Sequence, residues 1–204
     1  MRCAVKKYEI VMTGAPVDFR KARLAPIDNY VWGCEYRPEA YARLAFVPGD
    51  GFYAKLTVKE KDPRAVYRSN MDPVYKDSCL EFFAAYKPGG YINCEMNANG
   101  AILSAYGAGR EGRVPLDKIC GRFPDVTAKR SGDRWTVTVR IGLDIIEAVY
   151  GDDSFAEGDV IYGNFYKCGD DTDVPHYGSF ASVGTKKPDF HRPEFFAPMV
   201  LTKI

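Results

Sequence analysis

The sequence predicts an all-β protein, a β-sandwich of two antiparallel sheets with one short helix. Nineteen glycines and 13 prolines are spread along the 204 residues and divide the chain into short runs, a pattern typical of strands joined by turns. Within the runs, apolar and polar residues alternate with a period of two, and no strand–helix–strand rhythm appears. Many strands with a single helical segment favour a sandwich over other fold classes.

The clearest strand is predicted at residues 134–141. Trp135, Val137, Val139 and Ile141 alternate there with polar residues and share one face, which we expect to face the core. A hairpin is predicted from residues 79–97, with a turn at Pro88-Gly89-Gly90 between its two strands. The other predicted elements are strands at 51–59, 125–130, 160–168 and 199–204 and the short helix at 142–150.

Composition indicates an ordinary globular chain. Hydrophobic residues make up 46% and charged residues 27%, and one β-sandwich domain can span all of residues 1–204. The net charge of +1 excludes the strong positive field of a nucleic-acid-binding protein. Tyrosine and phenylalanine are abundant, at 14 and 12 residues; they suit strands and also the faces of sugars. Oligomeric state stays open.

The ends and cysteines of the chain bear on its compartment. No apolar run is long enough to span a membrane, and charges interrupt the first ten residues, so no signal peptide is predicted. The protein is therefore expected in the cytoplasm, or outside the cell if a leader has been removed. The six cysteines form no C-x-x-C pair, and we expect them to be reduced and structural.

Polar side chains within the predicted hairpin indicate a binding site. Glu81 shares a strand face with Cys79 and Phe83, and a buried carboxylate costs several kcal/mol unless it is paired. It must therefore pair with a buried cation or line a concave site. Asn93, Glu95 and Asn97 leave one face of the next strand, where they suit a polyhydroxylated ligand; a solvent-facing strand is the alternative.

For three other sets of polar residues, a structural role is the alternative to ligand or metal binding. Asp77-Ser78 precedes a strand and is interpreted as a turn that satisfies backbone N–H groups. Residues 170–173 form an acidic loop with oxygen donors suited to calcium, but the loop lacks the EF-hand pattern, and a solvated turn is the alternative. His176 and His191 are the only histidines, too few for a closed zinc site.

Four segments occur in an order and at a spacing that resemble the family 9 carbohydrate-binding modules. They are residues 73–83, 91–100, 164–168 and 190–196, and the likeness extends from about Trp32 to the C-terminus. The closest resemblance is to the stand-alone, family 9-like bacterial relatives. It implies a β-sandwich of the DOMON type that binds a sugar between two aromatic side chains, with polar residues and structural calcium nearby.

The resemblance also implies which residues form the site. Tyr75 stands six residues before Glu81, where sugar-binding members carry tryptophan, and Phe190 occupies the position of the second aromatic. Both rings are smaller than tryptophan, which implies a different sugar or a loss of sugar binding. The complete predicted cleft comprises Tyr75, Glu81, Asn93, Lys167, Phe190, His191 and Arg192.

We expect non-catalytic binding of a mono- or oligosaccharide. No nucleophile-elbow, zinc-protease, P-loop or dinucleotide motif is present. Two alternatives stay open. The carboxyls of Glu81 and Glu95 lie on neighbouring strands, as a glycan-processing enzyme requires. Some DOMON relatives bind haem through histidine and methionine, and Met71 and Met96 are available. No cofactor is predicted with certainty; calcium is the metal that the resemblance suggests.

Overall fold

Strands dominate the computed structural model, which describes residues 6–203. Within these residues, thirteen strands belong to one hydrogen-bonded sheet. They are β1 (Tyr8–Met12), β2 (Ala25–Pro26), β3 (Ala40–Val47), β4 (Gly51–Lys59), β5 (Cys79–Ala85), β6 (Tyr91–Asn97), β7 (Ile102–Gly107), β8 (Val114–Pro115), β9 (Asp125–Ser131), β10 (Arg134–Gly142), β11 (Val160–Gly169), β12 (His176–Ser179) and β13 (Ala197–Thr202). The all-β prediction is confirmed.

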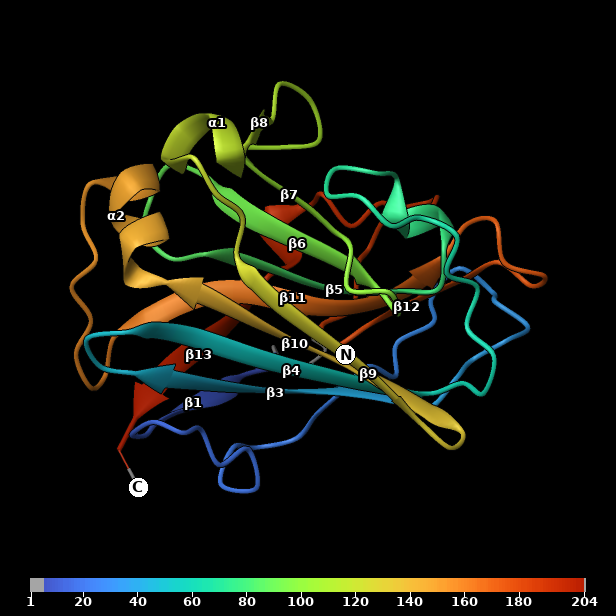
Figure 1. Ribbon diagram of the computed structural model, residues 1–204, viewed down its shortest axis with the longest axis horizontal. Helices are drawn as coiled ribbons and strands as arrows, with labels where there is room; N and C mark the ends of the chain where they lie inside the picture. The colour runs from blue at the N-terminus through green and yellow to red at the C-terminus, as the bar shows by residue number, and fades with distance from the viewer. Residues whose placement is uncertain (1–5, 204) are drawn as a thin grey trace.

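The sheet curls over on itself and forms the two layers of a sandwich (Figure 1). Strands follow the order β8-β7-β6-β5-β11-β13-β1-β3-β4-β10-β9, with β12 beside β11 and β2 beside β3. The two halves of this order face each other, because β4 packs against β5 and β10 packs against β6. Most pairs are antiparallel, but β1 runs parallel to both β13 and β3, a pairing that the sequence analysis did not predict.

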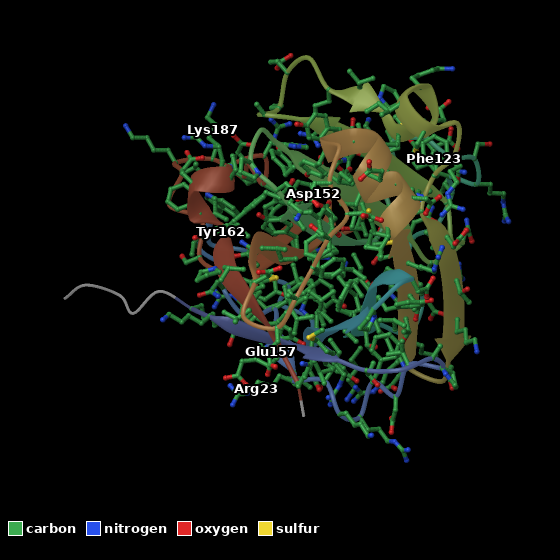
Figure 2. All side chains as sticks on the ribbon, turned by 90° about the vertical axis from the view of Figure 1, so that its left-hand side faces the viewer. Arg23, Phe123, Asp152, Glu157, Tyr162 and Lys187 are labelled. Atoms are coloured by element: carbon green, nitrogen blue, oxygen red, sulfur yellow. The ribbon has the colours of Figure 1, made fainter. Side chains whose placement is uncertain are left out.

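The main hydrophobic core lies between the two layers, where side chains fill the space (Figure 2). Trp135, Val137, Val139 and Ile141 are all buried in it, as predicted from their alternation. From the opposite layer, β5 contributes Leu80 and Phe82, and β6 contributes Ile92, Cys94 and Met96. The strand residues between these therefore point to the outer face of that layer, and this outer face carries the site.

The predicted helix is present as α2 (Leu143–Tyr150). It begins directly after β10 and ends at Gly151, whose φ of 71° only glycine adopts without strain. The expectation of one helix was too low, because α1 (Leu116–Cys120) packs beside α2 at one end of the molecule (Figure 1). Five residues are too few for a helical period to show in the sequence. Two 3₁₀ turns also occur, η1 (Val74–Lys76) and η2 (Pro193–Phe195).

The other predicted strands are present with small changes of boundary. Strands β5 and β6 form the predicted hairpin, in which Glu81 lies directly opposite Glu95. The closing strand predicted at 199–204 is β13, which starts at Ala197; Ile204 lies outside the described residues. None of the described helices is long and apolar enough to cross a lipid bilayer.

Candidate functional site

A cavity of about 430 Å³ opens on the outer face of strands β5, β6, β7 and β11. Its volume lies within the roughly 300–1,000 Å³ of small-molecule sites. The strands supply its floor and the loops supply its walls. The floor consists of Glu81, Phe83, Asn93, Glu95, Leu103, Ala105 and Cys168, and the walls include Met71, Tyr75, Arg110, Arg113, Asp170, Tyr177, Asp189, Phe190 and His191.

Five of the seven predicted site residues line this one cavity: Tyr75, Glu81, Asn93, Phe190 and His191. They come from four separate parts of the chain, namely η1, β5, β6 and the loop before η2. The cavity therefore gathers the two aromatic positions and the two polar strand residues that the sequence analysis combined. The prediction was wrong in placing Lys167 and Arg192 with them.

Lys167 lies on the opposite face of the sheet from the cavity. Its ammonium group is fully buried and donates hydrogen bonds to Ser78 Oγ and the Cys168 carbonyl, both at 2.9 Å, and contacts His176 Nε2 at 2.6 Å. The Glu60 carboxylate lies 3.8 Å away. The physical reason is alternation, because Lys167 shares a strand face with Phe165, which packs in the core. Lys167 is therefore part of a buried polar network.

Arg192 does not line the cavity either. Its guanidinium pairs with Glu194 at 2.6 Å and lies 3.8 Å from Asp189, and its side chain is 43% exposed. Arg192 is the residue before η2, and its backbone N–H donates to the Phe190 carbonyl. This tight turn directs neighbouring side chains in different directions, so proximity in sequence to Phe190 did not place Arg192 in the site.

The two aromatic positions differ in what they offer a ligand. Phe190 is only 8% exposed, because its ring stacks on Tyr166 with centroids 4.1 Å apart and planes 13° apart. Trp32 lies against it at 5.8 Å. One face of Phe190 is therefore covered by protein. Tyr75 is only partly buried and lines the cavity from η1, so it presents the more accessible ring.

Arg113, which the sequence analysis did not identify, anchors Asn93. Its guanidinium donates to Asn93 Oδ1 at 2.7 Å and to the carbonyls of Tyr91 and Ala105 at 3.0 and 2.9 Å. It also lies over the Tyr91 ring, 4.2 Å from the centroid. With Asn93 Oδ1 occupied in this way, the Asn93 amide donates from Nδ2 to Glu95 Oε1 at 2.9 Å. Arg113 and Asn93 thus fix the orientation of Glu95.

Two carboxyls side by side form the polar part of the floor. Glu81 and Glu95 are 2% and 4% exposed. Burial raises the pKa of Glu95 to about 7. Burial, together with Cys168 and Glu95 beside it, raises the pKa of Glu81 well above its usual value. Cys168 donates from Sγ to Glu81 Oε1 at 2.9 Å. Such a pair can donate and accept hydrogen bonds at neutral pH.

His191 closes the site beside Glu95. Its Nδ1 pairs with the Tyr91 hydroxyl at 2.8 Å, and its Nε2 lies 3.8 Å from Glu95 Oε1. Burial, aided by the nearby Arg113 and Arg110 charges, lowers the pKa of His191 to about 4. The imidazole is therefore neutral at pH 7, and its contact with Glu95 is not an ion pair.

Asp77 satisfies backbone N–H groups, as predicted, but these belong to a distant loop and not to a local turn. Its carboxylate accepts the backbone N–H groups of Val66 and Tyr67 at 2.9 and 3.0 Å and pairs with Arg64. Asn97 joins this network, because it donates to Asp77 and to the Tyr67 carbonyl. Asn97 therefore holds a loop and does not line the cavity, although it shares a strand face with Asn93 and Glu95.

Within residues 6–203, one group of three side chains has the residue types and the spacing that could hold a metal ion. The ligand atoms of Cys79, Glu81 and Cys168 all lie within 4.8 Å of one another. The acidic loop at 170–173 forms no such group, since Asp170 lines the cavity and Asp171 lies 3.5 Å from Lys76. Calcium binding stays a prediction. The haem alternative is weakened, because both ring nitrogens of His176 are engaged, one by Lys167 and one by the Val174 carbonyl.

The lining residues that the sequence analysis missed are divided between loops and strands. Arg110, Arg113, Asp170 and Asp189 lie in loops, whereas Cys168 lies on β11 and Tyr177 on β12. Loop residues carry no periodic signal, so the alternation that identified Glu81 and Asn93 could not find them. One usable signal was the need of a buried strand amide for a partner, which Arg113 supplies.

The curled sheet and its outer-face cavity define a β-sandwich with a cavity of the size that small-molecule sites have. The model of carbohydrate-binding family 9 matches residues 12–201. The chain therefore belongs to carbohydrate-binding family 9. A search of curated proteins returned no match.

Solved structures with the same fold span nearly the whole chain. One comes from Bacteroides uniformis and is provisionally assigned as a carbohydrate-binding protein; it is 25% identical, with a TM-score of 0.80, and the match covers 97% of this chain and 100% of that one. A family 9 module from Caldicellulosiruptor kristjanssonii, solved with cellotriose and with glucose, is 12% identical with a TM-score of 0.67. Those matches cover 98% of this chain and 95% and 97% of the modules, and they establish the shared fold.

Proposed function

We propose that this protein binds a mono- or oligosaccharide in the cavity above Glu81 and Glu95 and does not transform it. One observation carries the proposal: five residues chosen by pattern and resemblance line a single cavity of about 430 Å³ in a member of a carbohydrate-binding family. A partly buried aromatic ring, Tyr75, lines the cavity together with two buried carboxyls and the partly buried imidazole of His191. Apolar ring faces and a few fixed polar groups are what a sugar requires.

The arrangement of the carboxyls favours binding over hydrolysis. Glycosidases place two carboxyls on either side of the scissile bond. Glu81 and Glu95 are direct neighbours on one sheet face, so both approach a ligand from the same side. We therefore expect no release of glucose when the protein is incubated with cellotriose. Release that disappears in Glu81→Gln would overturn this part of the proposal.

The net charge and the free thiols bear on the partners and the cellular compartment of the protein. The net charge of +1 supports a role without nucleic acid. The cysteines at positions 34, 79, 94, 120 and 168 are unpaired, and all but Cys120 are buried, which supports a reducing compartment such as the cytoplasm. Oligomeric state is left open by this proposal.

Isothermal titration with a panel of neutral, amino and acidic sugars tests the proposal. We expect at least one sugar to bind with a micromolar to millimolar Kd, about −4 to −8 kcal/mol. Glu81→Gln should weaken binding about tenfold or more, since a buried polar group that loses its hydrogen bond costs roughly 1–3 kcal/mol. Tyr75→Ala should have a similar effect, and Tyr75→Trp should strengthen binding by enlarging the ring face.

Arg192→Ala is the matched control for these variants. Arg192 lies two residues from Phe190 but does not line the cavity and pairs with Glu194, so its removal should leave the Kd unchanged. Absence of binding across the whole panel would overturn the proposal. Equal loss of affinity in Arg192→Ala and Tyr75→Ala would also contradict it, because it would place the ligand outside the cavity.

A further inference from the structure

We propose that the preferred ligand is an amino sugar whose ammonium group pairs with Glu81 and Glu95. This inference rests on the proposed function and specifies the chemical class of the ligand. It is carried by two carboxyls that are more than nine-tenths buried, line the cavity and lack a cationic partner among the described residues. A carboxyl that is buried without such a partner favours its protonated form, and a cationic ligand would supply the partner that lets it ionise.

One oxygen of Glu81 and one of Glu95 receive no hydrogen bond within the described residues. Glu81 accepts one hydrogen bond, from the Cys168 thiol to Oε1, and Glu95 accepts one, from the Asn93 amide to Oε1. Within residues 6–203, no donor reaches Oε2 of either residue. Each carboxyl therefore keeps an oxygen for a ligand, and the two oxygens belong to residues that lie directly opposite each other on β5 and β6.

The cations near the floor are engaged elsewhere. Arg113 directs its guanidinium to Asn93 Oδ1 and to backbone carbonyls. Arg110 pairs with Asp189 at 2.8 Å. His191 is neutral at pH 7, because burial lowers its pKa to about 4. None of the three neutralises the carboxyl pair by direct contact.

The cavity as a whole is acidic. Four carboxyls line it, those of Glu81, Glu95, Asp170 and Asp189, against two guanidiniums, those of Arg110 and Arg113. Since Arg110 and Asp189 form an ion pair, the remaining groups include three carboxyls and one guanidinium. Burial also raises the pKa of Asp170. A ligand that carries a positive charge favours ionisation of these carboxyls, whereas an acidic sugar opposes it.

Binding of an ammonium group should therefore release protons from the Glu81 and Glu95 carboxyls. The groups that face the pair are Cys79 on β5, Tyr166 and Cys168 on β11, Tyr91 on β6, Asp170, and the loop residues Arg110, Arg113, Asp189 and His191. An ammonium ion favours the ionised carboxyls, so affinity should rise as pH increases through about 7. The rise ends where the amine loses its own proton.

Glucosamine, glucose and N-acetylglucosamine are suitable probes, because acetylation removes the positive charge at the same ring position. In isothermal titration at about pH 7 we expect glucosamine to bind at least tenfold more tightly than glucose. N-acetylglucosamine should have no such advantage. Titration in two buffers with different ionisation enthalpies should reveal proton release with glucosamine alone.

Glu95→Gln should reduce the glucosamine-to-glucose affinity ratio about tenfold, and thermal unfolding would verify that this variant is folded. Glu147→Gln is the control, because Glu147 is an exposed acid on α2 and its removal should leave the ratio unchanged. Equal affinity for glucosamine and glucose, or a preference for glucuronic acid, would overturn the inference while sugar binding still stands. Failure of every sugar to bind would overturn the proposed function as well.

Discussion

At the scale of single residues, the floor of the cavity is shaped by the cost of burying carboxyls. Glu81 and Glu95 occupy opposite positions on β5 and β6, where mutual repulsion and burial favour their protonated forms. Asn93 and Cys168 each donate one hydrogen bond to them. Asn93 is held in turn by Arg113, so a loop cation orients a strand amide, which orients a carboxyl.

Stability should depend on pH through Glu95. The pKa of Glu95 rises from 4.5 to about 7 in the folded protein. The contribution of the protonated carboxyl to the free energy of unfolding is therefore fully present below about pH 4.5 and is lost as pH rises through 7. Glu95→Gln cannot ionise. Between about pH 5 and pH 8 the parent should therefore lose up to about 3 kcal/mol of unfolding free energy relative to this variant.

Urea unfolding at several pH values measures this difference. Glu147→Gln, which removes an exposed acid on α2, is the control for the loss of one carboxyl. A difference between the parent and Glu95→Gln that stays constant with pH would contradict the raised pKa of Glu95.

At the scale of secondary-structure elements, alternation decides which side chains reach the site. On β11, Tyr166 and Cys168 point to the cavity side, whereas Phe165 and Lys167 point to the core side. The sequence analysis applied this rule to β5 and β6 and placed Glu81 and Asn93 correctly in the cavity lining. It did not apply the rule to Lys167, which was selected by resemblance and proved to belong to a buried network with Ser78 and His176.

Strand β10 gives the clearest test of the core. Trp135 is 1% exposed and donates from Nε1 to Glu60 Oε2 at 2.9 Å. Trp135→Ala should lower the unfolding free energy by about 3–5 kcal/mol through the cavity that it leaves. Thr138→Ala, on the outer face of the same strand, should change it by less than about 1 kcal/mol. Chemical denaturation compares the two, and a loss below about 1 kcal/mol for Trp135→Ala would contradict its place in the core.

At the scale of the whole molecule, the curl of the sheet brings distant segments together. Strand β1 lies between β13 and β3 and runs parallel to both, so residues near the two ends of the chain are joined in one sheet. The same curl places the loop that carries Phe190 and His191 beside strands β5 and β6. The site therefore depends on the complete fold.

The reactivity of the thiols tests both the burial of the cysteines in the fold and the cellular compartment of the protein. Of the five described cysteines, which are all unpaired, four are buried and Cys120 is partly exposed; Cys3 lies outside the described residues. Without reductant, Ellman's reagent should react with Cys120 first in the native protein and with at least five thiols after unfolding in guanidinium. Two or fewer free thiols after unfolding would contradict a reduced, structural role.

The sequence by itself determined the fold class, the core face of β10, the hairpin of β5 and β6 and the two polar residues Glu81 and Asn93. These features follow from a period of two, which is a local property that any strand must satisfy. Tyr75 and Phe190 came from resemblance, and the structure places both at the cavity.

Only the tertiary structure decided which loop residues join the site and which partners the buried groups find. Arg113 lies 20 positions from Asn93 but donates to it at 2.7 Å, and His191 lies 100 positions from Tyr91 but bonds its hydroxyl at 2.8 Å. No periodic pattern encodes such contacts. They arise because buried polar groups must be paired, and the curl of the sheet determines which of the available partners lies within reach.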